Sequence, residues 1–468
     1  EYDARGNVTK KTDALGRSTT ITYNARNDPI TRTDALNQVT NFTYDAAGNL
    51  TGTTDALGNT VAVTYNAAGL PLAVTDARGN ATTSTYDAQG NTISVTDALG
   101  NITSFTYDAA GRRVTRTDAL KRTTSFAFDA NDNLVATIDA TKQSVTQAFD
   151  ANDNRIAATD KRGFTTQFAY DVKDRLESTT DPLGQSLRYG YDGLDRRISV
   201  VDKRGNVSAL EYDAVGNLTR ATDALAHATP FEYDLNGNRT RAIDALGNPT
   251  QFAYDALNRR TTTTDPLNNV TRTFYDALGR VSSAINAKGQ ITSFGYDALG
   301  RLTLVTDANG GALSYTYDAN GNRLTMADPL GKVTSYAYDA LNRLITKTEP
   351  LTTVTQYEYD ALGNLKKVTR PNGTIVNYSY DTLDRLATVA YPDKTQVAFT
   401  YDANGNRLQM SDSAGVSAFT YDALNRMLTH TNPFGRQVGY GYDANGNRTS
   451  LTYPGNKTAT YAYDALNR

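Results

Sequence analysis

The chain has 468 residues and a net charge of −3, and its Lys and Arg residues are scattered along the sequence instead of clustered. This balance argues against the dense basic stripe of a nucleic-acid-binding protein, and the absence of cysteine excludes disulfides, thiolate catalysis and cysteine-ligated metals. No apolar stretch approaches the roughly 18 residues of a membrane-spanning helix.

An aromatic residue followed by Asp or Asn recurs along the whole chain, from Tyr2 to Tyr463. The spacing is 21 residues at every step except one, the 20 residues between Tyr401 and Tyr421. A period of this size across a whole chain is typical of a solenoid or a related repeat array. We therefore expect residues 1–468 to form one continuous array of about 22 repeats. Because the chain starts at Glu1 and ends halfway through the motif, we also expect it to be a segment of a longer protein.

One clean repeat, residues 44–64, contains the pattern Asp-Ala-x-Gly-Asn twice, at residues 45–49 and 55–59, and the other repeats vary this pattern. Asp at the first position and Gly at the fourth favour a type I turn, in which Gly accepts a positive φ. We call the turn that follows the aromatic residue the first turn and the other the second turn. In the first turn the Gly position holds only Gly, Asn or Asp, the residues that best tolerate the left-handed region. In four second turns Pro follows the acidic residue, where its fixed φ suits a type I turn; these are Pro182, Pro266, Pro329 and Pro350.

Between the turns lie segments of five or six residues rich in Thr, Val, Ile and aromatic residues, a normal length for a strand. Connections this short join antiparallel neighbours. The residue two positions before the motif aromatic is usually aromatic too, as in Phe105 and Tyr107, so that both rings share one face of a strand. The signature positions in representative repeats are Tyr44, Asp45, Gly48, Asp55, Gly58, Phe105, Tyr107, Asp108, Gly111, Tyr296, Asp297, Gly300, Tyr401, Asp402 and Gly405.

The predicted fold is all-β: antiparallel hairpin units that form one continuous sheet of about 46 strands. At about 4.8 Å per strand, the strip is roughly 220 Å long and about 20 Å wide. Strands twist, so a sheet of this length curls, and we expect a spiral, either a hollow shell or an open coil. The row of rings then needs cover from the next turn of the spiral or from its contents.

No residue pattern predicts a catalytic, cofactor-binding or metal site, and we assign none. The abundant carboxylates repeat identically in turns, unlike paired catalytic acids, which need different environments. Residues 129–133 and 150–154 bear a faint likeness to a calcium loop, but the Gly and the distant Glu of an EF-hand are missing, which favours turns over calcium. His227 and His430 lie about 200 residues apart, and we expect both to be solvated surface residues.

The sequence resembles the Rhs/YD-repeat family. The likeness rests on the Tyr-Asp pair, the Gly-Asn or Gly-Arg that follows it, and the Thr-Asp-Ala-Leu-Gly half-repeat of residues 54–58, and it covers essentially the whole chain. The family includes bacterial Rhs toxins, the C component of Tc toxins, wall-associated proteins and the teneurins. The resemblance implies a hollow β-shell, which in the toxin branch encloses a C-terminal toxin released by Asp-dependent self-cleavage. Two elements similar to the cleavage region, residues 181–184 and 328–331, lie in ordinary second turns, and we interpret them as turns.

The resemblance therefore implies a non-enzymatic scaffold: the wall of a shell around a C-terminal toxin or effector domain in a large bacterial protein. The implied partners are that domain or neighbouring repeats, with no nucleic acid, no membrane span and no cofactor. The implied location is secreted, at the cell surface, or exported by a bacterial secretion system. The alternative is a surface protein whose array is adhesive, through cell or carbohydrate contacts, or forms filaments with other copies.

Overall fold

The computed structural model describes all 468 residues and consists of 44 strands joined by turns, without a helix. Each strand pairs antiparallel with the next strand in the sequence, from Lys10 to Thr460, so the sheet is unclosed and follows the chain order. The predicted all-β fold of tandem antiparallel hairpins is confirmed. The count is two below 46 because the strand that would end at Tyr2 is reduced to a single bridge with Val8, and the last turn, at residues 464–468, is followed by no strand in this sequence.

The first half of the sheet contains β1 Lys10–Thr12, β2 Ser18–Tyr23, β3 Pro29–Thr33, β4 Val39–Tyr44, β5 Leu50–Thr54, β6 Thr60–Tyr65, β7 Pro71–Thr75, β8 Ala81–Tyr86, β9 Thr92–Thr96, β10 Ile102–Tyr107, β11 Arg113–Thr117, β12 Thr123–Phe128, β13 Leu134–Ile138, β14 Ser144–Phe149, β15 Arg155–Thr159, β16 Thr165–Tyr170, β17 Leu176–Thr180, β18 Ser186–Tyr191, β19 Arg197–Val201, β20 Val207–Tyr212, β21 Leu218–Thr222 and β22 Ala228–Tyr233. The second half contains β23 Arg239–Ile243, β24 Pro249–Tyr254, β25 Arg260–Thr264, β26 Val270–Tyr275, β27 Val281–Ile285, β28 Ile291–Tyr296, β29 Leu302–Thr306, β30 Ala312–Tyr317, β31 Arg323–Ala327, β32 Val333–Tyr338, β33 Leu344–Thr348, β34 Val354–Tyr359, β35 Leu365–Thr369, β36 Ile375–Tyr380, β37 Leu386–Ala390, β38 Gln396–Tyr401, β39 Arg407–Asp412, β40 Gly415–Tyr421, β41 Met427–Thr431, β42 Gln437–Tyr442, β43 Arg448–Tyr453 and β44 Lys457–Thr460.

The first turns have the predicted geometry. At residues 108–112, the Gly111 N–H donates to the Asp108 carbonyl at 3.0 Å, and φ of Gly111 is +79°. Positive φ occurs at this position in every first turn, whether Gly, Asn or Asp occupies it. The register then shifts by one residue between Thr106 and Tyr107, which marks a β-bulge beside the turn. Such bulges recur at the first turns and increase the local twist, so they bend the strip.

The single 20-residue spacing has a local cause. Between β39 and β40 the second turn is a tight two-residue hairpin, in which Asp412 pairs with Gly415. Gly415 has a φ of +124°, a conformation that side chains with a Cβ rarely adopt. One residue is therefore saved without a break in the sheet.

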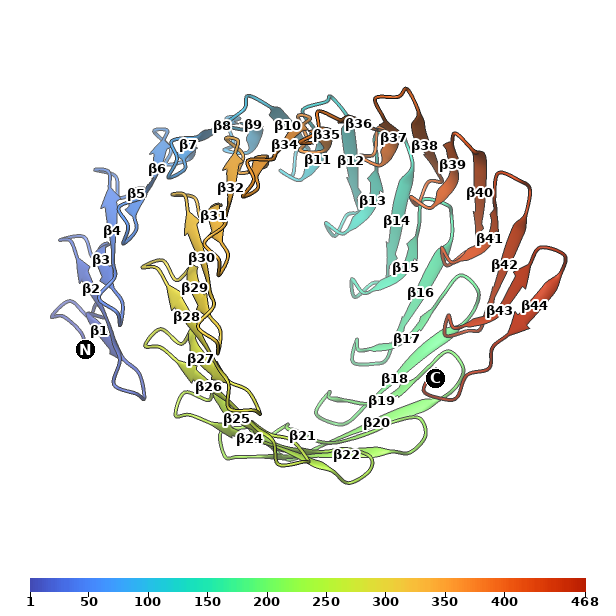
Figure 1. Cartoon of the computed structure of the whole chain (residues 1–468), viewed down its shortest axis with the longest axis horizontal. Coiled ribbons are helices and arrows are strands. Elements are labelled where there is room, and N and C mark those ends of the chain that lie inside the picture. Colours follow the sequence, from blue (N-terminus) through green and yellow to red (C-terminus); the bar gives the residue numbers. More distant parts are fainter.

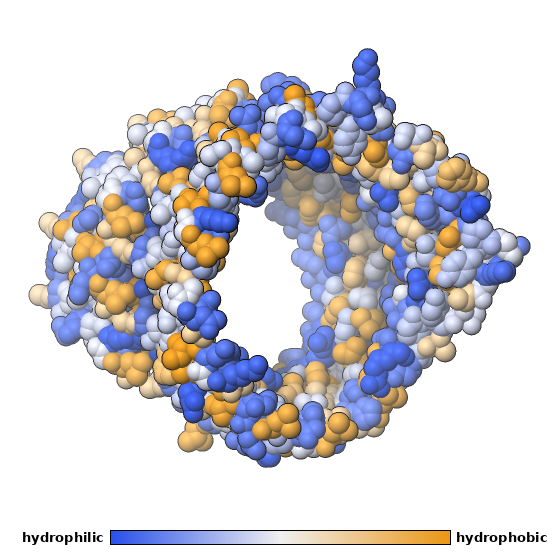
Figure 2. Space-filling view, in the orientation of Figure 1, coloured by the Kyte–Doolittle hydropathy of each residue, from blue (hydrophilic) through white to orange (hydrophobic).

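The strip curls into a spiral around a central opening (Figures 1 and 2). In Figure 1, β1–β5 lie beside β26–β30, and β42–β44 lie beside β16–β19. Arginine hydrogen bonds between the windings mostly join residues 259 to 262 positions apart, which corresponds to about twelve and a half repeats, or about 25 strands. At about 4.8 Å per strand, one winding has a circumference of about 120 Å and a backbone radius of about 19 Å.

The wall is one sheet thick, and Val376 and Phe419 are its only buried large apolar residues. The rings are covered mainly by arginines of the same ribbon. Arg175, for example, lies 4.8 Å over the Tyr191 ring, and Arg113 contacts Phe105 and Phe126 on neighbouring hairpins. The expectation that the rings need the next turn or the contents for cover was therefore incomplete, because cation–π contacts along the ribbon supply much of it.

Candidate functional site: the seam and the open edges of the ribbon

Two features of this spiral sheet can carry a function: the contact between its windings and its exposed edges. First turns lie along one edge of the ribbon and second turns along the other, because consecutive strands alternate in direction. Where the spiral overlaps itself, the second-turn edge of the first winding meets the first-turn edge of the second winding. We call this contact the seam.

The signature residues build the two edges. The Asp45 carboxylate accepts the Asn49 N–H at 2.9 Å, and Asp108, Asp297 and Asp402 act in the same way in their own turns. The Tyr107 hydroxyl donates to the Thr92 carbonyl at 2.9 Å, which ties each repeat to the one before it. The same bond is made by Tyr44, Tyr296 and Tyr401. These residues lie far apart on the spiral and form no single cluster, so their role in the structure is repeat geometry.

Five arginines of the first winding cross the seam and donate to first-turn carbonyl oxygens of the second winding. They are Arg17, Arg78, Arg122, Arg162 and Arg204, which bond the carbonyls of Asp276, Asp339, Asp381, Asp422 and Asp464, respectively. Each of these carbonyls also accepts an N–H of its own turn, as that of Asp422 does from Asn425 at 3.2 Å, so the arginine is its second donor. The seam is thus held by charge-assisted hydrogen bonds between segments about 260 residues apart.

Three of these arginines insert between two consecutive first turns. Arg78 donates to the carbonyls of Asp339 and Tyr338 at 3.0 and 3.1 Å, and its Nε lies 3.5 Å from the Asp318 carboxylate of the preceding turn. Arg162 lies in the same way between Asp402 and Asp422. Arg204 does so between Asp443 and Asp464. Each guanidinium therefore clamps two repeats of the opposite winding.

A second set of seam bonds runs in the opposite direction. Asn320, Asn404 and Asn445 donate through Nδ2 to the carboxylates of Asp76, Asp160 and Asp202 at 2.6 to 2.7 Å. Burial raises the pKa of Asp202, but the hydrogen bonds from Asn206 and Asn445 outweigh it and lower the pKa below the usual value. The Asp202 carboxylate therefore stays ionised at neutral pH.

Burial separates the seam from the open edges. On the open first-turn edge, Leu194 and Val215 are 68% and 84% exposed, whereas the corresponding Leu278 at the seam is 37% exposed. The second-turn edge shows the same difference in exposure: Leu246 is 87% exposed on the open part, and Leu57 is 48% exposed at the seam. Burial also raises the pKa of a run of seam tyrosines, namely Tyr317, Tyr338, Tyr359, Tyr380, Tyr401, Tyr421 and Tyr442. The windings thus pack against each other.

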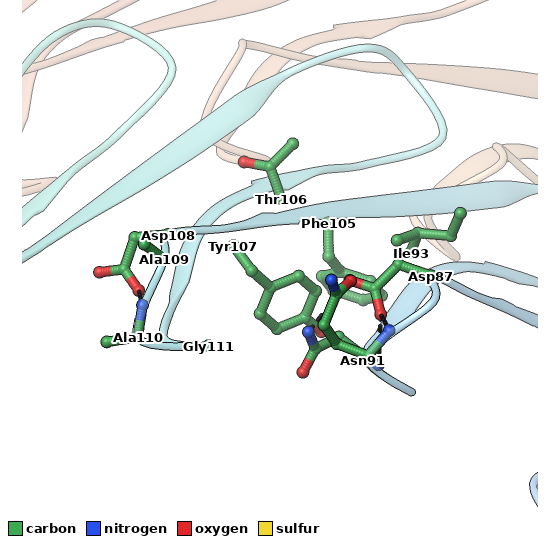
Figure 3. A pocket seen from close by; sticks show the side chains of 11 residues that line it. Asp87, Asn91, Ile93, Phe105, Thr106, Tyr107, Asp108, Ala109, Ala110 and Gly111 are labelled. Atoms are coloured by element: carbon green, nitrogen blue, oxygen red, sulfur yellow. Dashed lines mark hydrogen bonds between the residues drawn. The ribbon is translucent and has the colours of Figure 1, made fainter.

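A surface groove lies on the open first-turn edge, between the turns that begin at Asp87 and Asp108 (Figure 3). It has a volume of about 690 Å³ and includes Tyr107, Phe105 and Asn91 in its lining. A similar groove lies between the turns at 213 and 234. Both are the open counterparts of the spaces that seam arginines fill.

Sequence reasoning missed the seam arginines, although a signal was present. Arg at the third position of a second turn, followed by Gly, occurs only at Arg78, Arg162 and Arg204. All three face the second winding. The pairing partner could not be known, however, because the number of repeats per winding follows from twist and curvature.

The remaining candidate residues take structural positions. Asp181 and Asp328 accept the Gly184 and Gly331 N–H groups at 2.9 and 2.8 Å, so both Asp-Pro elements form ordinary turns. No group of three or more His, Asp or Glu side chains has the arrangement of a metal site. The structure contains no helix that is long and apolar enough to cross a membrane.

The two histidines differ. His227 is half-exposed and bonds Asp223 through Nδ1 at 3.0 Å. The expectation of a solvated residue was wrong for His430, whose ring stacks on the Phe419 ring at 4.8 Å and 5°. Both rings project from paired strands, β40 and β41, where cross-strand neighbours face each other. His430 is thus part of the packing of the wall.

A spiral sheet of tandem hairpins with a seam between its windings defines a structural repeat scaffold of the β-shell class. The chain belongs to the RHS Repeat family, whose matches fall within residues 2–60, 65–144, 149–270 and 275–333. Residues 330–468 also match the Teneurin YD-shell family. The Rhs/YD resemblance seen in the sequence is therefore confirmed.

Solved structures show the same fold. The crystal structure of TcdB2-TccC3 matches with a TM-score of 0.72 and 15% identity, over 98% of this chain and 32% of that chain. The structure of TcdB2-TccC3 without its hypervariable C-terminal region matches with a TM-score of 0.71 and 15% identity, over 98% and 34%. The chain spans about a third of the length of these relatives. No curated protein sequence matches it.

Proposed function

We propose that residues 1–468 are a single array within a longer protein and form part of the wall of a shell that encloses a C-terminal toxin or effector domain. The observation that carries this proposal is the seam: five arginines and three asparagines join successive windings into a continuous wall around a central opening. An adhesive ribbon has no need for such joints. The likeness to the TcdB2-TccC3 fold supports the same reading. The wall acts by enclosure, without catalysis, in a protein that is secreted or exported.

The test is protease protection in the full-length protein that contains this segment. We expect its C-terminal domain to resist a protease that digests the isolated domain. Simultaneous Arg78→Gln, Arg162→Gln and Arg204→Gln substitutions should open the seam and restore cleavage. Arg116→Gln is the matched control, because Arg116 is an exposed residue of β11 outside the seam. Equal digestion of the domain in the intact protein and in isolation would exclude enclosure.

The alternative, a filament or adhesive surface, is favoured by one observation. The open second-turn edge exposes a row of large apolar side chains, namely Leu246, Leu267, Leu330, Leu351 and Phe434. Such a row is a contact surface for another protein. Electron microscopy of the full-length protein separates the two functions: capped hollow particles support the shell, and open fibres support the filament.

A further inference from the structure

The open first-turn edge carries three turns that share the Asp, Asn and Asn positions of three occupied seam turns. Six first turns read Asp-x-Asn-x-Asn, and we call them asparagine turns; they begin at Asp129, Asp150, Asp234, Asp318, Asp402 and Asp443. Three second turns read Asp-x-Arg-Gly, and we call them arginine turns; they begin at Asp76, Asp160 and Asp202. The three arginine turns pair with the last three asparagine turns, one to one.

The pairing uses the same contacts each time. The third residue of the asparagine turn donates to the first Asp of the arginine turn, as Asn404 does to Asp160 at 2.6 Å. The arginine then enters the groove between the asparagine turn and the next first turn, as Arg162 does between Asp402 and Asp422. Recognition thus needs both turns, since each supplies a donor and an acceptor.

The groove between an asparagine turn and the next first turn contains no arginine of its own ribbon, because the fifth residue of an asparagine turn is Asn. Where this residue is Arg, it generally reaches along the ribbon to the next first-turn carbonyl, as Arg175 does to Asp192 at 3.1 Å. Arg259 is the exception, since it bonds only the Asp255 carboxylate and the next carbonyl, that of Asp276, accepts from Arg17 of the first winding. In asparagine turns it is Asn, which leaves that carbonyl to a donor from outside. All four second-winding first turns with Asn there, Asn322, Asn364, Asn406 and Asn447, border a groove that a seam arginine occupies.

The three asparagine turns on the open edge are preorganised in the same way. Asn131 and Asn133 both donate to the Asp153 carboxylate, at 3.0 and 2.7 Å. In the occupied turn, Asn404 and Asn406 donate to Asn425 at 3.0 and 2.6 Å. The side chains are therefore already placed in the absence of a neighbouring winding. Asn131, Asn152 and Asn236 are exposed, whereas their seam counterparts are half-buried.

We propose that the asparagine turns at 129, 150 and 234 are docking sites for arginine turns of another repeat ribbon. That ribbon would present Asp-x-Arg-Gly turns 21 and 84 residues apart, in step with the three sites. A second copy of this chain does not fit, because its three arginine turns are used in its own seam and its open second-turn edge, residues 223–457, contains none. The open first-turn edge therefore binds a different ribbon, and it recognises that ribbon through the arginines of its arginine turns.

The test uses the cysteine-free whole chain with one cysteine introduced, Asn131→Cys. The probe is a cyclised hairpin peptide with the sequence of residues 155–170, an arginine turn in which the position of Asp160 is cysteine. The control is Lys173→Cys, at the same position of a first turn whose groove is filled by Arg175. Asn236→Cys is a second variant at another open site, in case Asn131→Cys fails to fold.

Disulfide trapping is followed over time in the presence of oxidised glutathione. We expect trapping at Asn131→Cys to exceed that at Lys173→Cys by about tenfold, the factor given by one hydrogen bond to a charged group. A peptide with Arg162→Gln should lose this preference. Equal trapping at both positions, or a preference that survives Arg162→Gln, would overturn the proposal. So would self-association of the wild-type chain that Asn131→Ala and Asn236→Ala abolish, since it would assign the edge to a second copy.

Discussion

Removal of one seam arginine is a direct test of how the windings are joined. Arg162 lies at the seam with only 14% of its side chain exposed. It donates to the Asp422 carbonyl at 2.6 Å and lies 3.5 Å from the Asp402 carboxylate. The substitution Arg162→Gln shortens the side chain and removes its charge. We expect the two windings to separate locally while the ribbon itself stays intact, because the strand pairing on either side does not involve this residue.

The free-energy cost of Arg162→Gln depends on which hydrogen bonds its former partners keep. The Asp402 carboxylate keeps its bonds to the Asn404 and Asn406 N–H groups, so it is not left unsatisfied. The Asp422 carbonyl loses the Arg162 donor but keeps the Asn425 N–H at 3.2 Å, and it gains access to water when the seam opens. The cost is therefore near the lower end for a charge-assisted hydrogen bond, about 2 kcal/mol. This corresponds to about a 30-fold increase in the population of the opened seam.

Amide hydrogen exchange of the turns at 160–164 and 402–406 measures this opening. An unfolding midpoint would not, because a repeat array of this length is not expected to unfold in a single two-state step. We expect faster exchange in both turns, which lie about 240 residues apart, and no change elsewhere. Arg116→Gln should leave both turns unchanged. An effect confined to the turn at 160–164 would refute the seam, since it would reduce Arg162 to a local role.

Three further substitutions test the repeat itself. Tyr107→Phe removes the hydroxyl bond to Thr92 and should raise exchange in β9 by a factor that corresponds to about 1 kcal/mol. Gly111→Val should cost about 1–2 kcal/mol in local exchange because φ is +79°, whereas Gly111→Asn should be tolerated. Burial raises the pKa of Asp139, but the hydrogen bonds from Lys161 and the turn donors outweigh it and lower the pKa to about 2. The ionised Asp139 therefore stabilises the turn fully above the pKa of the unfolded state, and this stabilisation is lost as the pH falls toward 2. Lys161→Ala should move that loss, followed by exchange in this turn, to higher pH.

Much of the fold could be predicted from the sequence because it is determined locally. Asp108 and Gly111 specify a turn within five residues, and the alternation of Phe105 and Tyr107 specifies which face of the strand holds the rings. Because these patterns recur along the chain, a repeat that departs from them can still be assigned from its neighbours. The four prolines of the second turns add the same kind of local signal in their own repeats.

The seam could not be predicted because it depends on a sum of small angles. Asp76 meets Asn320 only because about 25 strands complete one winding, and a change of a few degrees in twist per strand would bring a different turn to face it. The cover of the rings was also missed, since Arg113 is adjacent in space to Phe126 but not in the pattern of apolar residues. In both cases the deciding side chain is an arginine, which sequence patterns assign to the solvent.

In the proposed shell, the inner radius of a winding limits the size of the domain that it can enclose. A backbone radius of about 19 Å leaves about 13 Å inside the side chains, with roughly 6 Å taken by the side chains themselves. A compact domain of 100 residues has an outer radius of about 17 Å, so it does not fit within this part of the spiral. The twist of the ribbon sets the number of repeats per winding and therefore this radius. A cargo enclosed by windings of this size is therefore elongated along the axis or lacks a compact fold.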